Sequence, residues 1–195
     1  GNEEAALSFA GAIQDLDPAE GPFLVIDIGG GSTEFVFGTS SVEAARSVNI
    51  GCVRMTERHF ANDPATPQQV ELARTDIQAA IAQAAAEVPI TRAKTLVAVA
   101  GTATTVAAAA LDLPEYDRYA IHLARISADR AHHISQQLLR ETREQRAAHG
   151  YMHPGRVDVI GAGSLVLDRI MLASGATEFV ASESDILDGM AWSLV

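Results

Sequence analysis

The segment of residues 27–34 carries the residue types that a phosphate site needs, in the order Asp-Ile-Gly-Gly-Gly-Ser-Thr-Glu. Glycines accept positive φ angles and lack the Cβ that would hold a ligand away, so their consecutive N–H groups can converge on an anion. The two hydroxyl residues that follow add further donors. The predicted phosphate-binding residues of this loop are Gly29, Gly30, Gly31, Ser32 and Thr33.

Two carboxylates, Asp27 and Glu34, flank this loop. Negative side chains beside a bound anion are unfavourable unless a cation lies between them. Magnesium suits that position because it prefers carboxylate, water and phosphate oxygens. We therefore predict Mg²⁺ as the cofactor, with Asp27 and Glu34 as its ligands. On this segment alone, a glycine-rich turn with two solvated acids explains the same residues.

A second segment has the composition of an anion-binding turn. Residues 95–100 are typical of a buried strand, Gly101 and Thr102 of a tight turn, and residues 104–111 of a helix. Free N–H groups and the dipole at the start of such a helix favour a negative charge. Gly101 and Thr102 therefore join the predicted phosphate-binding residues. The first loop precedes a strand and has no following lysine, so it is neither a dinucleotide motif nor a P-loop.

The elements that would position these loops begin with strands and continue as helices alternating with strands. A capping box of Thr66 and Gln69 predicts a long helix that starts at Pro67. This order of elements indicates an α/β fold. Strands are predicted over residues 23–28, 34–38, 42–50, 95–100 and 178–181. Helices are predicted over residues 4–13, over 104–111, twice between 127 and 149, over 157–172 as a buried helix, and from 184 or 185 to 192.

Length and charge restrict the class of protein. The chain has 195 residues and a formal net charge of −11, values that fit one soluble domain and argue against sequence-independent binding of nucleic acid. A single cysteine, Cys52, excludes a disulfide framework. No leader is apparent, and no apolar run approaches the roughly 18 residues of a membrane span. We expect a cytoplasmic protein without nucleic-acid or membrane partners.

Residues 27–34 closely resemble the phosphate motif of the exopolyphosphatase and guanosine pentaphosphatase family. Other stretches resemble the same family in family order along nearly the whole chain. The resemblance implies an α/β, ribonuclease-H-like domain of the actin, Hsp70 and sugar-kinase superfamily, with a mixed sheet flanked by helices. The further matching stretches are residues 1–5, 49–54, 98–102, 153–160 and 187–190.

The resemblance also implies a domain organisation and an activity. Residues 1–195 would form the C-terminal domain of a two-domain phosphatase, whose N-terminal domain would precede Gly1 and complete an interdomain active site. The implied reaction is Mg²⁺-assisted, in-line attack of water that releases terminal phosphate from inorganic polyphosphate or guanosine pentaphosphate. Glu4 would deprotonate that water, and Glu34 is the second implied catalytic residue. Family members commonly form homodimers, so a homodimer is a further expectation.

Two other hypotheses remain open. An ATP-binding kinase or Hsp70-like module of the same fold would also use an aspartate and a glycine hairpin, with Gly161 and Gly163 as a candidate adenosine loop. Alternatively, this half of the protein is a binding or dimerisation module without turnover. Arg54 lies near a family stretch but outside the predicted site. The other basic residues considered are interpreted as solvated helix charges: Arg143, Arg146 and Arg156.

Overall fold

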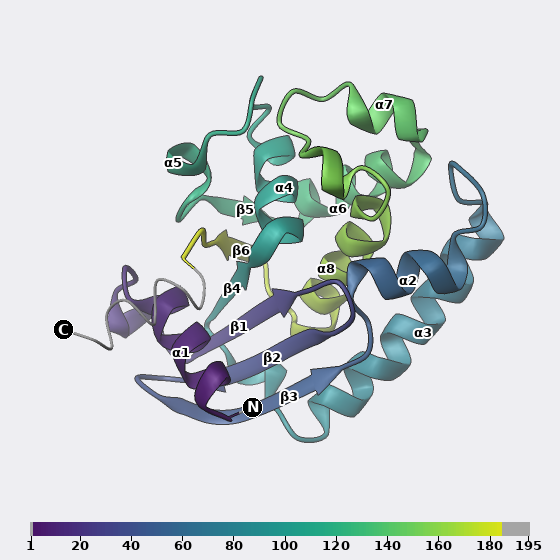
Figure 1. Ribbon diagram of the computed structural model, residues 1–195. Coiled ribbons are helices and arrows are strands. Elements are labelled where there is room, and N and C mark those ends of the chain that lie inside the picture. Colours follow the sequence, from purple (N-terminus) through teal and green to yellow (C-terminus); the bar gives the residue numbers. More distant parts are fainter. Residues whose placement is uncertain (1, 185–195) are drawn as a thin grey trace.

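The computed structural model contains a six-stranded mixed sheet (Figure 1), and it describes the backbone of residues 2–184 and the side chains of residues 5–184. The strands are β1 (Phe23–Ile28), β2 (Thr33–Gly38), β3 (Val42–Val48), β4 (Thr95–Val99), β5 (Arg125–Ser127) and β6 (Glu178–Ala181). Their order is β3-β2-β1-β4-β6-β5. Strand β2 is antiparallel to both β1 and β3, β4 runs parallel to both β1 and β6, and β5 is antiparallel to β6.

Strand β1 contributes to a core on each face of the sheet. Leu24, Ile26 and Ile28 point into the larger core, whereas Phe23 and Val25 point into the smaller one. Side chains alternate between the faces of a strand, so a strand covered on both faces has a nearly continuous apolar sequence. That burial explains why residues 23–28 and 95–99 could be recognised as strands.

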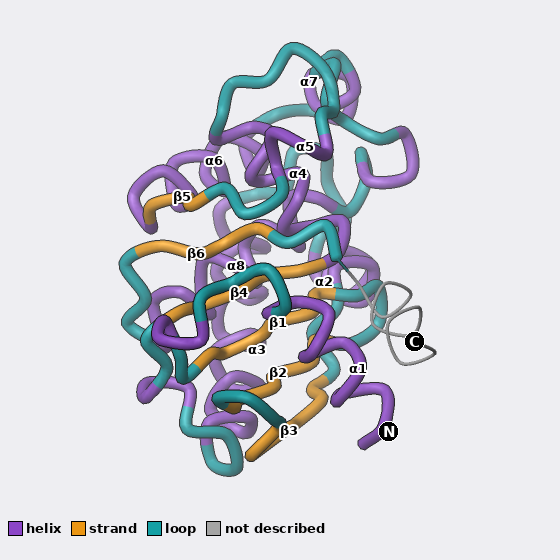
Figure 2. The backbone as a smooth tube through the Cα atoms, turned by 90° about the vertical axis from the view of Figure 1, so that its left-hand side faces the viewer, coloured by secondary structure: helices purple, strands orange, loops and turns teal. Residues whose placement is uncertain are grey.

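Helices cover the two faces unequally. Helix α1 (Asn2–Ile13) packs Phe9 and Ala12 on the smaller core, on one face of the sheet, whereas α3 (Pro67–Ala85) and α8 (Ile160–Ser174) lie on the opposite face (Figures 1 and 2). Both bonds of the predicted capping box are present at the start of α3. The other helices of the described residues are α2 (Cys52–His59), α4 (Ala100–Ala110), α5 (Arg118–Ile121), α6 (Ala128–Arg140) and α7 (Arg143–Ala147).

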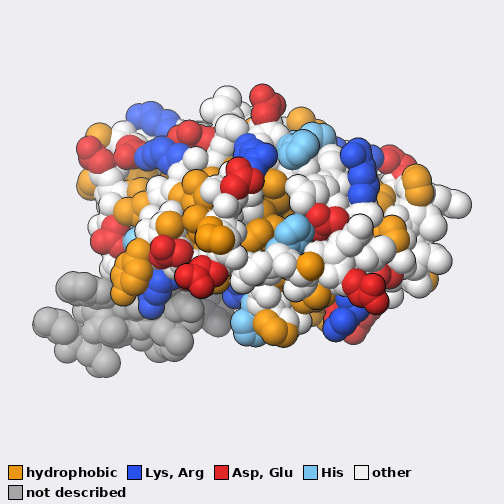
Figure 3. Space-filling model, turned by 90° about the horizontal axis from the view of Figure 1, so that it is seen from above, with side chains coloured by type: hydrophobic (Ala, Val, Ile, Leu, Met, Phe, Trp, Pro, Cys, Tyr) orange, Lys and Arg blue, Asp and Glu red, His pale blue; other side chains and the backbone are white. Residues whose placement is uncertain are grey.

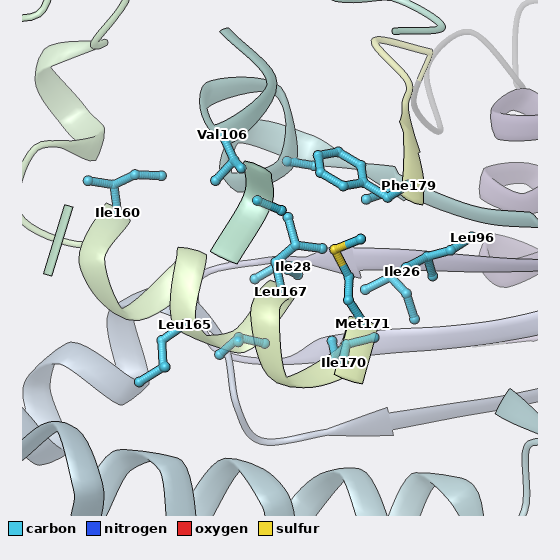
Figure 4. Packing of buried hydrophobic residues seen from close by; sticks show 14 of the residues in the cluster. Ile26, Ile28, Leu96, Val106, Ile160, Leu165, Leu167, Ile170, Met171 and Phe179 are labelled. Atoms are coloured by element: carbon cyan, nitrogen blue, oxygen red, sulfur yellow. The ribbon is translucent and has the colours of Figure 1, made fainter. Parts of the chain in front are cut away.

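Helix α8 is the central helix of the larger core. Its residues Leu165, Leu167 and Ile170 are almost completely buried, and Figure 4 shows Leu165 and Leu167 on different sides of the helix, so α8 is buried around most of its circumference. The prediction of a buried helix is therefore confirmed, although the helix begins at Ile160 because Pro154–Arg156 form a separate 3-10 turn. No helix in the described part of the chain is both long and apolar enough to cross a membrane.

The mixed α/β architecture agrees with the sequence-based expectation, and two local features differ. Helix α4 begins at Ala100, so Gly101 and Thr102 lie in its first turn and not in a turn before it. The sequence did not indicate α2, α5 or β5, which are short and largely polar. The helix expected from residue 184 or 185 to 192 lies outside the described residues.

Candidate phosphate-binding site

Parallel pairing of β1 with β4 brings the two predicted phosphate loops to one edge of the sheet. In the register of this pair, Asp27 lies beside Val99. The glycine loop follows β1 directly, and helix α4 follows β4 directly. Ligands of α/β sheets characteristically bind beyond the carboxyl ends of parallel strands. Residues 29–32 and the first turn of α4 thus occupy the edge at which such a ligand would bind.

The start of helix α2 holds the glycine loop. The N–H group of Cys52 donates to the Gly29 carbonyl at 2.9 Å, and the N–H group of Arg54 donates to the Gly30 carbonyl at 3.0 Å. The Arg54 side chain adds a third bond, from Nε to the Gly31 carbonyl at 2.7 Å. All three glycine carbonyls therefore bond to the first turn of one helix.

Gly51 makes this arrangement sterically feasible. A Cβ at Gly51 would lie 2.4 Å from both the carbonyl carbon and the oxygen of Gly30, and 2.5 Å from the Gly31 nitrogen. These neighbours are backbone atoms, which cannot move aside as the end of a side chain can. A glycine is therefore required at the point where the chain entering α2 crosses the phosphate loop.

The predicted metal ligands, Asp27 and Glu34, are direct cross-strand partners in the β1–β2 pair. Directly opposed residues of an antiparallel pair project from the same face, with Cβ atoms about 4.5–5.5 Å apart. That face also carries Val25 and Val36 and is the one covered by α1. The structure thus places the two predicted ligands together, next to the glycine loop.

Two serine hydroxyls orient the Glu34 carboxylate. Ser32 and Ser47 each donate from Oγ to Oε1 of Glu34 at 2.7 Å. The Ser32 hydroxyl, which the sequence assigned to phosphate, donates to this carboxylate. The backbone N–H of Ser32 is not involved in these bonds.

The acidic pair meets the requirements of Mg²⁺. No group of three or more His, Cys, Asp or Glu side chains in the described residues is arranged to hold a metal. Magnesium commonly needs only one or two carboxylates, with water and substrate phosphates as the other ligands. Asp27 and Glu34 beside a phosphate loop fit that requirement.

Helix α4 starts through a backbone conformation that is unusual for a side-chain-bearing residue. Ala100 has a φ angle of 65°, in the left-handed region that costs a non-glycine residue roughly 1–3 kcal/mol. This conformation allows the helix to begin immediately after β4, so its first N–H groups lie at the edge of the sheet. Such strained residues cluster at functional sites.

Arg156 lies against this helix start. A Cβ added at Gly101 would lie 2.4 Å from Nε of Arg156, so the guanidinium occupies the space above the glycine. Its Nη1 donates to the Thr105 hydroxyl at 3.1 Å, and the group lies 5.8 Å from the centroid of the Tyr116 ring. The interpretation of Arg156 as a solvated helix charge was wrong, because the tertiary fold places its guanidinium beside a predicted phosphate-binding residue.

Two of the predicted phosphate-binding side chains face the interior. Thr33 is fully buried, and its hydroxyl donates to the carbonyl of Ile50 at 3.1 Å. Thr102 is 5% exposed and contacts α8 at Gly163, where a Cβ would lie 2.6 Å from its Oγ1. Both hydroxyls therefore serve packing, and at Thr102 only the backbone N–H, in the first turn of α4, remains suited to an anion.

Two of the other three arginines also depart from the sequence interpretation. Arg54, left outside the predicted site, is bonded to the phosphate loop. Arg146 was interpreted as solvated but is 8% exposed, and its guanidinium donates to the carbonyls of Val157 and Glu141 and to Asp63. Arg143 is an exposed ion-pair partner of Asp158, as expected for a solvated helix charge.

Two further residues bear on the chemistry. The backbone of Glu4 lies in α1, on the face that carries the acidic pair, but its side chain lies outside the described residues.

Burial raises the pKa of the Cys52 thiol, and a hydrogen bond with Thr102 partly offsets this effect. A thiol with a raised pKa is a poor nucleophile, so the cysteine has a packing role next to the site.

One side of the molecule has mixed surface charge. Figure 3 views the structure from the top of Figure 1 and shows acidic and basic side chains interspersed there, without one broad basic area. At the edge of the sheet where the glycine loop lies, the donors available to an anion are local, namely backbone N–H groups and the two arginines, Arg54 and Arg156. A diffuse positive surface of the kind that binds nucleic acid is not seen on this face.

Comparison with known proteins places these features in a family. Exopolyphosphatase 2 of Mycobacterium tuberculosis is 46% identical over the whole chain, which spans 62% of that relative's length. The crystal structure of an exopolyphosphatase-like protein is 40% identical with a TM-score of 0.94, and it matches all of this chain and 66% of its own. The PPX-GPPA enzyme of Aquifex aeolicus has a TM-score of 0.89 at 25% identity, over 98% of this chain and 63% of its own.

The solved relatives share the architecture described above, which confirms the expected actin/Hsp70/sugar-kinase fold. The family model described as the Ppx/GppA phosphatase family matches residues 1–193. The match includes the glycine loop, the acidic pair and the start of α4, so it extends well beyond a single motif. The chain belongs to the Ppx/GppA phosphatase family.

Proposed function

We propose that this protein is an exopolyphosphatase, which releases the terminal phosphate of inorganic polyphosphate. One observation carries the proposal: a glycine loop, the start of α4 and an acidic pair meet at one edge of the sheet, with Arg54 and Arg156 beside them. The name of the M. tuberculosis relative supports the choice of polyphosphate.

Each group has a role in this proposal. The backbone N–H groups of Gly30, Gly31 and Ser32 bind phosphoryl oxygens from one side, and those at Gly101 and Thr102 bind them from α4. Asp27 and Glu34 would hold Mg²⁺, which supplies neutralisation of phosphate charge. Phosphoryl transfer to water depends mainly on positioning and charge neutralisation, and these groups provide both.

Glu4 is the proposed general base. Helix α1, which carries Glu4, covers the sheet face from which the acidic pair projects. We propose that water approaches the terminal phosphate from this side. The N-terminal domain expected before Gly1 would close the cleft and add basic residues. We propose that residues 1–195 form the C-terminal half of that two-domain enzyme.

Guanosine pentaphosphate is the alternative substrate, because the same groups recognise a terminal phosphate on either molecule. The kinase hypothesis gains no support from the candidate adenosine loop. Gly161 and Gly163 are buried within α8, and Gly163 lies against Thr102. They form a close helix contact and not an adenosine loop.

Phosphate release tests the proposal. The full-length protein is incubated with Mg²⁺ and either long-chain polyphosphate or guanosine pentaphosphate, alongside Glu4→Gln and a control, Glu43→Gln. Glu43 is an exposed acid of β3 that hydrogen-bonds Thr39. We expect release by the parent and the control, and a loss of roughly 10²- to 10⁴-fold in Glu4→Gln. Turnover of ATP without release from either substrate would favour the kinase.

A further inference from the structure

The three carbonyl groups of the glycine loop constrain the directions of three N–H groups. In a planar trans peptide, the carbonyl of one residue and the N–H of the next point in opposite directions. The carbonyls of Gly29, Gly30 and Gly31 all accept hydrogen bonds from the start of α2. The N–H groups of Gly30, Gly31 and Ser32 must therefore point away from α2.

These three bonds differ in their donors. Main-chain N–H groups hold the first two carbonyls, so no side-chain substitution removes those donors. The third carbonyl, that of Gly31, is held by Nε of Arg54 at 2.7 Å. The direction of the Ser32 N–H, which belongs to the same peptide group, thus depends on one exposed side chain.

The position of this peptide makes its direction important. Ser32 donates its hydroxyl to Glu34, one of the proposed metal ligands. Of the three N–H groups, that of Ser32 is the closest in sequence to Glu34. Gly31, on the other side of the peptide bond, gives little steric resistance to rotation. Without an external constraint, this peptide could rotate and present its carbonyl oxygen to the anion.

We infer that Arg54 is a positioning residue, which keeps the Gly31–Ser32 peptide in the orientation that directs the Ser32 N–H at a phosphate oxygen. The inference rests on the proposed phosphatase function. In this role Arg54 promotes phosphate binding through its Nε–H donor, which holds the peptide, and not through direct attraction between its charge and the substrate.

Two substitutions separate the donor from the charge. In Arg54→Gln, the amide nitrogen falls at the place of Nε along the side chain, so the donor is kept and the charge is lost. In Arg54→Met, a carbon takes that place and both are lost. Arg58→Gln is the matched control, because Arg58 lies on the same helix and pairs with Asp76 away from the loop.

The measurements are the KM and kcat for tripolyphosphate in the full-length protein, and the NMR signals of the Gly31 carbonyl carbon and the Ser32 amide. We expect Arg54→Gln to keep both NMR signals near those of Arg58→Gln. Arg54→Met should shift both signals and raise KM roughly three- to tenfold above Arg54→Gln. A smaller change in kcat is expected.

Equal KM values and equal signals in the glutamine and methionine variants would overturn the positioning role. The positioning role would also be overturned if Arg54→Gln raised KM as much as Arg54→Met while its NMR signals stayed unchanged. The weaker binding would then be due to the lost charge. If the parent releases no phosphate, the proposed function fails. The positioning role is then judged on the two NMR signals, which need no turnover.

Discussion

The guanidinium of Arg156 lies directly over the Cα of Gly101, at the first turn of α4. A Cβ at position 101 would meet Nε, Cζ and Nη2 of the arginine at 2.4, 2.6 and 2.7 Å. These atoms lie at the end of a flexible side chain, which can move aside. Glycine at this position therefore determines where a positive charge lies relative to the start of the helix.

Gly101→Ala should displace that charge without unfolding the protein. We expect the free energy of unfolding to change by less than about 1 kcal/mol and KM for polyphosphate to rise roughly tenfold, the order of one charge-assisted hydrogen bond. A double-mutant cycle with Arg156→Met checks the cause. If Gly101→Ala raises KM by the same factor in the Arg156→Met variant as in the parent, displacement of the arginine is not the cause.

Glu34→Gln should lower kcat by roughly 10²-fold or more, because the neutral amide neither neutralises Mg²⁺ nor supports catalysis. The fold should be kept, since the glutamine oxygen can still accept from Ser32 and Ser47. Ser47→Ala removes one orienting bond and should reduce kcat only a few-fold by this argument. Initial rates of phosphate release at saturating substrate give both values. Equal losses in the two variants would contradict a direct role of the carboxylate.

Asp27→Asn should change the requirement for magnesium. Chelation by EDTA should stop phosphate release by the parent, and added Mg²⁺ should restore it. In the variant, we expect the half-saturating Mg²⁺ concentration to rise roughly tenfold or more, because one hard anionic ligand has become neutral. Titration of activity against Mg²⁺ measures this change, with Glu43→Gln as the control. The same half-saturating concentration in all three proteins would rule out Asp27 as a ligand.

Arg146→Lys should destabilise the fold. The guanidinium donates to the carbonyl oxygens of Val157 and Glu141 at 2.8 and 2.6 Å and to Asp63 at 2.7 Å. An ammonium group cannot reproduce this planar set of donors. We expect a loss of about 2–4 kcal/mol in the free energy of unfolding by urea. The exposed Arg143→Lys should lose less than about 1 kcal/mol. Equal stabilities would show that the buried bonds contribute little.

Tyr151 should make stability fall at high pH. Burial, reinforced by the negative charge of Glu141, raises the pKa of this phenol from 10.0 to about 12. Between these values the unfolded chain loses the phenolic proton and the folded chain keeps it, so rising pH favours unfolding. The parent should lose about 1–3 kcal/mol more than Tyr151→Phe over this interval. Urea unfolding at pH 9, 10, 11 and 12 measures the difference, and parallel curves would contradict it.

The sequence by itself determined the elements whose evidence is local. The apolar runs of β1 and β4, the capping box at Thr66 and the glycine loop each depend on residues close together in the chain. The order of elements indicated the α/β class, and the family resemblance added the ribonuclease-H-like fold of the actin, Hsp70 and sugar-kinase superfamily. Asp27 and Glu34 are direct partners because a short hairpin loop fixes the register between their strands.

Only the tertiary structure decided which long side chains belong to the site. Arg54 bonds to Gly31, Arg156 covers Gly101 and Arg146 is buried, although all three are charged residues in short polar stretches. A flexible cationic side chain has no local pattern that reveals its partner. Its position depends on which distant segment the fold brings within reach. The same reason explains why the hydroxyls of Thr33 and Thr102 face the core. Thr33 contacts Ile50 and Thr102 contacts Gly163, and packing between elements remote in sequence brings these pairs together.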